Sequence, residues 1–108
     1  IYPGLTSHED HDLSKKILSE SGNMVSFVVA DGDEAGRKML NKMNVASQAI
    51  SLGGVESLIS MPYATTHASW TQEARIAAGI DLGFVRFSTG LEDFDDLKND
   101  FDQALSSL

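Results

Sequence analysis

A single arginine, Arg86, stands between two phenylalanines in GFVRFSTG, residues 83–90, a stretch that otherwise has the composition of a buried strand. In an extended chain, Arg86 points to the side opposite Val85 and Phe87. A guanidinium stays charged, and burying it without a partner costs much free energy. No carboxylate lies within four residues on either side. Two partners remain open: one of the chain's sixteen Asp and Glu side chains, or the carboxylate of a ligand, which the two-pronged guanidinium also fits.

Two polar stretches contain incomplete metal-binding patterns. In HEDH, His8 and His11 are three residues apart, whereas the metalloprotease pattern needs two histidines four apart. DGDEAG, residues 31–36, resembles the start of a calcium loop, but Ala35 stands at a ligand position and Lys42 replaces the final glutamate. We therefore expect a solvated helix start at the first stretch, a turn into a helix at the second, and no metal site.

The segment around His67 contains the residue types of a hydrolase site. Thr65, Thr66 and Ser69 supply hydroxyls beside this imidazole, as a nucleophile and its base would require. No carboxylate close by in the sequence could orient the histidine, and hydroxyls are common in loops. The sequence therefore favours a polar loop over a catalytic triad.

The overall charge argues against two classes of partner. Net charge is −8, and the eight Lys and Arg side chains are scattered, so no basic surface could neutralise phosphates of nucleic acid or an anionic membrane. No apolar run approaches the length of a membrane span. The chain has no cysteine, which fits a cytoplasmic protein and rules out disulfides.

Four stretches have the apolar spacing of helices. The first is expected to begin near Ser7, with Asp10 completing a capping box, and to end at Gly22. The second follows residues 31–36, and the third runs from about residue 71 to 78. The last is the clearest; Asp93 or Thr89 would cap it, and four acidic residues would crowd its first turn. We expect its apolar stripe to be buried against a sheet, with these members: Phe94, Leu97, Phe101 and Leu105.

Strands are predicted at residues 24–30 and 84–88, and two short apolar runs, 45–50 and 55–59, lie between them. Helices and strands thus alternate along a chain long enough for one domain. The predicted class is α/β or α+β, with a short antiparallel-rich sheet and helices packed on one face.

One long segment does not fit regular structure. Residues 51–69 contain Gly53-Gly54, Pro62 and many hydroxyls, but also enough apolar side chains to argue against disorder. A long irregular segment in a compact domain is usually functional. We therefore expect it to contribute to a site.

Several motifs resemble one enzyme family. They are SLGGVESLI, THAS, EARIAAGI and VRFSTGLEDFDDLKNDFDQAL, and the opening YPGLTSHEDHDLSKK resembles the family's YPGLPSHPQHELAKR segment. Together they resemble the C-terminal domain of the pyridoxal-phosphate enzymes of trans-sulfuration: cystathionine γ-synthase, cystathionine γ-lyase, cystathionine β-lyase and methionine γ-lyase. The resemblance runs from Tyr2 nearly to the end of the chain. It implies the small C-terminal domain of a fold-type I pyridoxal 5'-phosphate (PLP) enzyme, spanning residues 1–108.

The resemblance also implies a substrate site. In the family, the arginine of the R-x-S-x-G-x-E-D motif binds the α-carboxylate of the substrate, and that position is Arg86 here. The serine of SLGG and the threonine of THA line the same pocket, which implies roles for Ser51 and Thr66. The neighbours Ile50 and Leu52 are included in the expected site. An apolar residue at position 50 resembles methionine γ-lyase, whereas GGVES resembles the cystathionine enzymes.

The family's cofactor lysine, phosphate-binding loop and ring-stacking aromatic belong to a larger, preceding domain. None of the lysines here stands in the family's lysine motif, so we expect no catalytic or cofactor-binding residue in this chain and no activity from it alone. The intact protein would be a cytoplasmic, homotetrameric C–S lyase or γ-synthase acting on cystathionine, methionine, homocysteine or an O-acylhomoserine. The alternative is a non-catalytic interaction module that keeps only the fold.

Overall fold

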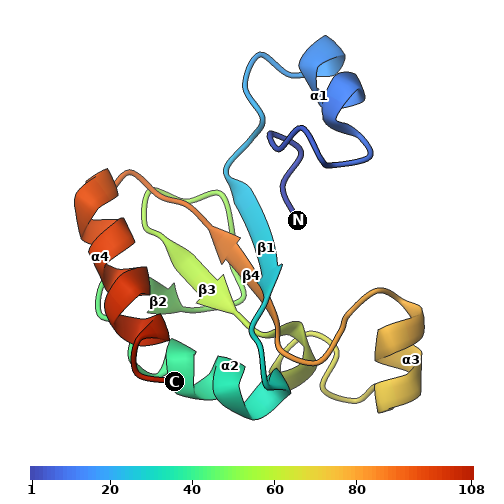
Figure 1. Cartoon of the computed structure of the whole chain (residues 1–108), viewed down its shortest axis with the longest axis vertical. Helices are drawn as coiled ribbons and strands as arrows, with labels where there is room; N and C mark the ends of the chain where they lie inside the picture. The colour runs from blue at the N-terminus through green and yellow to red at the C-terminus, as the bar shows by residue number, and fades with distance from the viewer.

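The computed structural model describes all residues from Ile1 to Leu108 (Figure 1). A sheet of four strands forms its centre, and helices lie at its face and ends. The elements in chain order are α1 (His11–Ile17), β1 (Met24–Val28), α2 (Gly32–Leu40), β2 (Ser47–Gln48), β3 (Leu58–Ser60), the 3₁₀ turn η1 (Pro62–Ala64), α3 (Gln72–Ala77), β4 (Phe84–Ser88) and α4 (Phe94–Leu105).

The sheet has the strand order β1-β4-β3-β2. Strand β4 is antiparallel to both of its neighbours, β1 and β3, whereas the short β2 runs parallel to β3. The sheet is therefore mixed but mostly antiparallel, and the predicted fold class is confirmed. This order makes β4 a central strand although it is the last one in the sequence.

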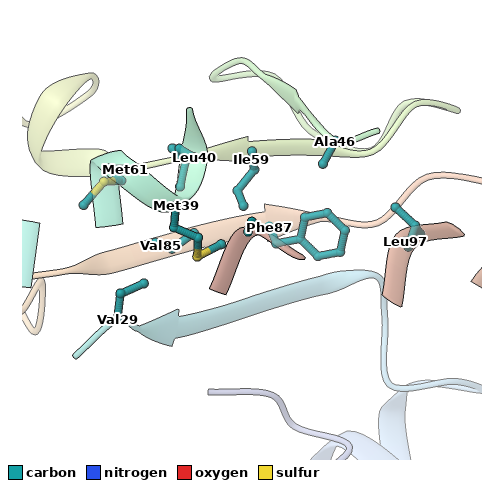
Figure 2. Packing of buried hydrophobic residues seen from close by; sticks show 10 residues of the cluster. Val29, Met39, Leu40, Ala46, Ile59, Met61, Val85, Phe87 and Leu97 are labelled. Carbon is teal, nitrogen blue, oxygen red and sulfur yellow. The ribbon is translucent and has the colours of Figure 1, made fainter. Parts of the chain in front are cut away.

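The two faces of the sheet differ in chemistry, because side chains alternate along each strand. Val85 and Phe87 of β4 share one face with Ile59 of β3, and all three are buried there against α2 and α4. Figure 2 shows this core, to which α2 contributes Met39 and α4 contributes Leu97. The opposite face carries the residues between these positions, and no helix of comparable size covers it (Figure 1).

Helix α4 begins where its cap predicts. The Asp93 carboxylate accepts hydrogen bonds from the backbone N–H groups of Asp95 and Asp96, which confirms one of the two expected caps. The expectation for its apolar stripe is only partly correct. Leu97 is buried and Phe101 packs edge-on against Phe87, but Phe94 is 75% exposed. Leu105 is also exposed, at 45% of its surface.

The expected first helix is wrong in its start and its length. Instead of a helix from Ser7, residues 2–11 form consecutive turns, and His8 Nδ1 accepts the backbone N–H of Asp10 at 3.1 Å. The helix then has only seven residues and ends at Ile17, while Gly22 adopts a positive φ of 83° in the turn before β1. His11 Nδ1 lies 2.9 Å from the carbonyl oxygen of Pro3. No helix of the chain has the length and apolar character needed to cross a membrane.

Candidate functional site

Arg86 occupies the middle of the central strand, on the face turned away from α2 and α4. Ser26 of β1 and Ser60 of β3 are its cross-strand partners. Both are small, so the long arginine side chain can extend over this face without a bulky neighbour in register. The residue as a whole is half-buried. The strand order thus places one cation at the centre of the face that α2 and α4 do not cover.

The guanidinium of Arg86 is held by backbone carbonyls rather than by a carboxylate. Nη2 donates to the carbonyl oxygens of Ile50 at 2.6 Å and Ser51 at 3.0 Å. Nε is buried without a hydrogen-bond partner, and Nη1 takes part in no hydrogen bond. The ion pairs of the chain are Glu34–Lys38, Asp33–Arg75 and Lys98–Asp102.

Of the two partners that the sequence left open for Arg86, the structure bears only on the first, an Asp or Glu of the same chain. A structural carboxylate is not its partner, although sixteen Asp and Glu residues are present. The carbonyl dipoles orient the guanidinium but leave its net charge uncompensated. The donors on Nη1 remain available to an anion, and the buried Nε–H has no partner within the chain.

The loop that supplies these carbonyls, residues 50–57, is attached to β4 and to the segment after it. The N–H of Gly53 donates to Ser88 Oγ at 3.0 Å, and Ser88 is itself fully buried in β4. Further along, the N–H of Leu91 donates to the carbonyl oxygen of Val55 at 2.8 Å. Each attachment joins residues more than thirty positions apart in the chain.

The strongest attachment of the loop is between Ser57 and Glu92. The backbone N–H and the hydroxyl of Ser57 each donate to one carboxylate oxygen of Glu92, both at 2.6 Å. Ser57 Oγ also accepts the N–H of Gly90 at 2.8 Å. The two hydrogen bonds from Ser57 hold the pKa of the Glu92 carboxyl below its usual value, because they favour the ionised form. The hydroxyl of Ser57 contributes most and its backbone N–H contributes next.

The expectation that Glu92 belongs to the first turn of the last helix is therefore wrong. The helix begins two residues later, and the Glu92 carboxylate is directed to the loop instead. Gly90 is required in the same place, because a Cβ there would collide with backbone atoms of Val55, Glu56 and Ser57. The sequence analysis did not identify Ser57 or Glu92 as functional candidates. The only signal was the E-D pair of the R-x-S-x-G-x-E-D motif, which contains Glu92 but not Ser57.

The structure brings some of the expected site residues together and leaves others apart. Ile50 and Ser51 contact Arg86, but through their backbones, and the Ser51 hydroxyl forms no hydrogen bond. Leu52 follows them and is exposed. The hydroxyl of Thr66 lies 2.8 Å from His67 Nδ1, and no hydrogen bond links Thr66 to Arg86.

A mostly apolar cavity of about 300 Å³ lies where β2 and β3 diverge. Ile50, whose carbonyl contacts Arg86, and Ser60, the cross-strand partner of Arg86, both line it. Arg37 donates to the hydroxyl of Tyr63 at its edge. The remaining lining residues are Leu40, Gln48, Ala49, Ile59, Met61, Ala64 and Thr65. The cavity is large enough for a small apolar group of a ligand.

No lysine is hydrogen-bonded to the residues around Arg86, where PLP would need one for its linkage. All five lysines are exposed, and Lys38 and Lys98 form ion pairs along their own helices. None of the lysines contacts the loop of residues 50–57 or Arg86 through a hydrogen bond. The residues around Arg86 therefore fit a carboxylate but do not fit the phosphate, ring or lysine linkage of that cofactor.

The chain is similar to known proteins over nearly its whole length. Residues 1–106 match the family described as Cys/Met metabolism PLP-dependent enzyme. The chain is 44% identical to an L-methionine gamma-lyase of Fusobacterium nucleatum subsp. polymorphum, over 99% of this chain and 27% of that protein. It is also 44% identical to a cystathionine gamma-lyase of Dictyostelium discoideum, over 97% of this chain and 27% of the relative.

Solved structures show the same likeness. A crystal structure of cystathionine gamma synthase from Xanthomonas oryzae pv. oryzae, in complex with aminoacrylate and cysteine, matches with a TM-score of 0.89 and 43% identity, covering 97% of this chain and 27% of that one. The cystathione gamma lyase CalE6 of Micromonospora echinospora matches with a TM-score of 0.90 and 37% identity, with the same coverage. The chain thus spans about a quarter of the length of the proteins that it resembles.

Proposed function

The chain belongs to the family of PLP-dependent enzymes of cysteine and methionine metabolism, and from this we propose that it forms the small C-terminal domain of a C–S lyase or γ-synthase. The substrates would be sulfur amino acids: cystathionine, methionine, homocysteine or an O-acylhomoserine. The reaction would be a β- or γ-elimination or a γ-replacement. The large domain of the same enzyme would complete the site, in a homotetramer of the cytoplasm.

The contribution of this chain is to bind the α-carboxylate of the substrate at Arg86. The observation that supports this role is a half-buried guanidinium that has two carbonyl partners and no carboxylate in its own chain. A substrate carboxylate would compensate the charge and take the donors that the carbonyls leave. Fixing the carboxylate in this way orients the amino acid relative to the cofactor. When bound, PLP supplies the electron sink that the reaction needs.

The other expected residues have supporting roles in this proposal. Ile50 and Ser51 hold Nη2 of Arg86 through their carbonyls and so set the direction of the guanidinium. The hydroxyl of Ser51, which is free, and that of Thr66, which contacts His67 Nδ1, would face the substrate and the large domain. Leu52 would limit the space next to them. The apolar cavity lined by Ile50 and Ser60 would receive the thioether part of the substrate.

The experiment that tests the proposed function is a substrate panel with the full-length enzyme that contains this chain. L-Methionine, L-cystathionine and an O-acyl-L-homoserine are each assayed for release of ammonia and of a 2-oxo acid, or for replacement by an added thiol. We expect turnover of at least one of them and none of the decarboxylated amine, because that amine has no anion for Arg86. Absence of turnover by protein with bound PLP would favour a non-catalytic module.

A further inference from the structure

The loop of residues 50–57 is held in place by polar contacts and not by burial of its apolar side chains. Ile50, Leu52 and Val55 are 58%, 55% and 68% exposed, so the hydrophobic effect fixes none of them. The loop is instead attached through Gly53 to Ser88, through Val55 to Leu91, and through Ser57 to Glu92 and Gly90. Its position therefore depends on this small set of hydrogen bonds.

We propose that Ser57 and Glu92 are positioning residues for the carboxylate site. They act through the loop, whose other end presents the carbonyls of Ile50 and Ser51 to Nη2 of Arg86. This role rests on the proposed function of Arg86 as the binding group for the substrate carboxylate. Neither Ser57 nor Glu92 touches the substrate in this account.

The geometry explains why this pair can determine the position of the loop. The carboxylate of Glu92 accepts two hydrogen bonds from a single residue, so it fixes both the backbone and the side chain of Ser57. Bonds to an ionised acceptor are stronger than those between neutral groups. Ser57 is fully buried, and its hydroxyl both donates to Glu92 and accepts from Gly90. Removing either partner would leave a polar group without its bond, and the loop could satisfy that group only by moving.

A movement of the loop would reach Arg86 directly. The two carbonyls are the only hydrogen-bond partners of its guanidinium in this chain. If they move, the guanidinium loses its fixed direction, and a displacement of about 1 Å is enough to weaken binding or reaction by large factors. The expected consequence is weaker binding of the substrate rather than a slower reaction of bound substrate.

The test is steady-state kinetics of the full-length enzyme with Ser57→Ala and with Glu92→Gln. We expect KM for the amino acid substrate to rise about 10-fold in Ser57→Ala, and less in Glu92→Gln, which keeps one acceptor oxygen, while kcat stays within about 2-fold. Glu56→Gln is the matched control, because it removes the same charge from the neighbouring exposed residue, which forms no hydrogen bond or ion pair. Its KM should be unchanged.

If Ser57 and Glu92 only stabilise the fold, their substitution should change kcat and not KM. Loss of folded enzyme lowers kcat per total protein and leaves KM unaltered, and this result in both variants would overturn the positioning role. Glutamine has nearly the shape of glutamate, so Glu92→Gln is the less disruptive substitution. If Ser57→Ala does not fold, KM and kcat of Glu92→Gln alone test the positioning role.

Arg86→Lys in the same assay separates this inference from the proposed function. If Arg86→Lys leaves KM unchanged, the carboxylate role of Arg86 fails, and the positioning role falls with it. If Arg86→Lys raises KM but neither Ser57→Ala nor Glu92→Gln does, only the positioning role is wrong. In the double variant, Ser57→Ala should add little to the effect of Arg86→Lys, because both act on the same interaction.

Discussion

Nη2 of Arg86 donates a hydrogen bond of 2.6 Å to the carbonyl oxygen of Ile50, a residue 36 positions earlier in the chain. This contact joins the central strand to the irregular loop and keeps the guanidinium aligned without neutralising it. A carbonyl is a neutral acceptor, so it orients the guanidinium without neutralising it. A carboxylate would have neutralised the charge and taken two of the N–H donors. The relationship leaves Arg86 both fixed in position and available to an anion.

Replacing Gly90 by alanine should displace the loop. The added Cβ would meet backbone atoms of Val55, Glu56 and Ser57, which cannot rotate away as a side chain can. We expect a raised KM and a lower melting temperature in Gly90→Ala of the full-length enzyme. Gly54→Ala is the control, since its Cβ would meet only the flexible side chain of Glu56, at 3.3 Å. Equal effects in both variants would contradict the packing explanation.

Much of the fold could be predicted from the sequence because it follows from local patterns. The apolar stretch with Phe27 and the one with Val85 became β1 and β4, and Thr71 caps α3 by accepting the N–H of Ala74, close to the expected start. The first helix failed because its expected cap, Ser7, lies within consecutive turns. Phe94 has the right spacing for the core, but at the first turn of α4 its side chain is mostly exposed to solvent.

The candidate site could be predicted only in part. Arg86 was identified because a charge in a buried strand needs an explanation. Its partners could not be predicted, because every residue has a carbonyl and the sequence therefore carries no sign of which one is used. Glu92 was assigned to the helix start by its acidic neighbours, and its actual contact with Ser57 depends on a loop whose course no local pattern determines.

Asp100 should be a main determinant of stability, because it satisfies three backbone groups at once. Its carboxylate accepts the N–H groups of Asn44, Val45 and Ala46 at 2.7, 2.8 and 3.0 Å, and the residue is almost fully buried. Asp100→Asn would place an NH₂ group against these donors, and we expect a loss of about 2–3 kcal/mol in the free energy of unfolding. Denaturant titration measures this loss. Asp96→Asn, which makes the same change at an exposed position, is the control.

The contribution of Asp100 should also depend on pH. Burial raises the pKa of its carboxyl, but the N–H donors of Asn44, Ala46 and Val45, with Gln103, lower it by more, and the net shift is downward. A lowered folded-state pKa gives stability that is present above the unfolded-state value of about 4 and is lost as the pH falls through the folded-state value. The difference between Asp100→Asn and the native chain should therefore shrink in that acidic range. A difference that stays constant there would contradict this assignment.

Phe101 should contribute more to the core than Phe94, although the sequence pattern treats them alike. The Phe101 ring packs edge-on against Phe87 and Phe27, with centroids 4.9 and 5.9 Å away. Because Phe101 is only partly buried, we expect Phe101→Ala to cost about 2–4 kcal/mol, at or below the range for fully buried phenylalanines. Phe94→Ala should cost less than about 0.5 kcal/mol, as is usual at exposed positions. Similar losses in the two variants would place Phe94 against a partner.

Binding of the substrate carboxylate by Arg86 predicts a specific change in the kinetics, but not in the melting temperature, of Arg86→Lys in the full-length enzyme. Lysine keeps the charge but loses the planar pair of donors that matches a carboxylate. Losing a charge-assisted hydrogen bond costs about 1.5–3 kcal/mol, so kcat/KM should fall about 10- to 100-fold while the bound PLP and the melting temperature stay near their native values. A native kcat/KM together with a lowered melting temperature would contradict this role and make Arg86 a structural residue.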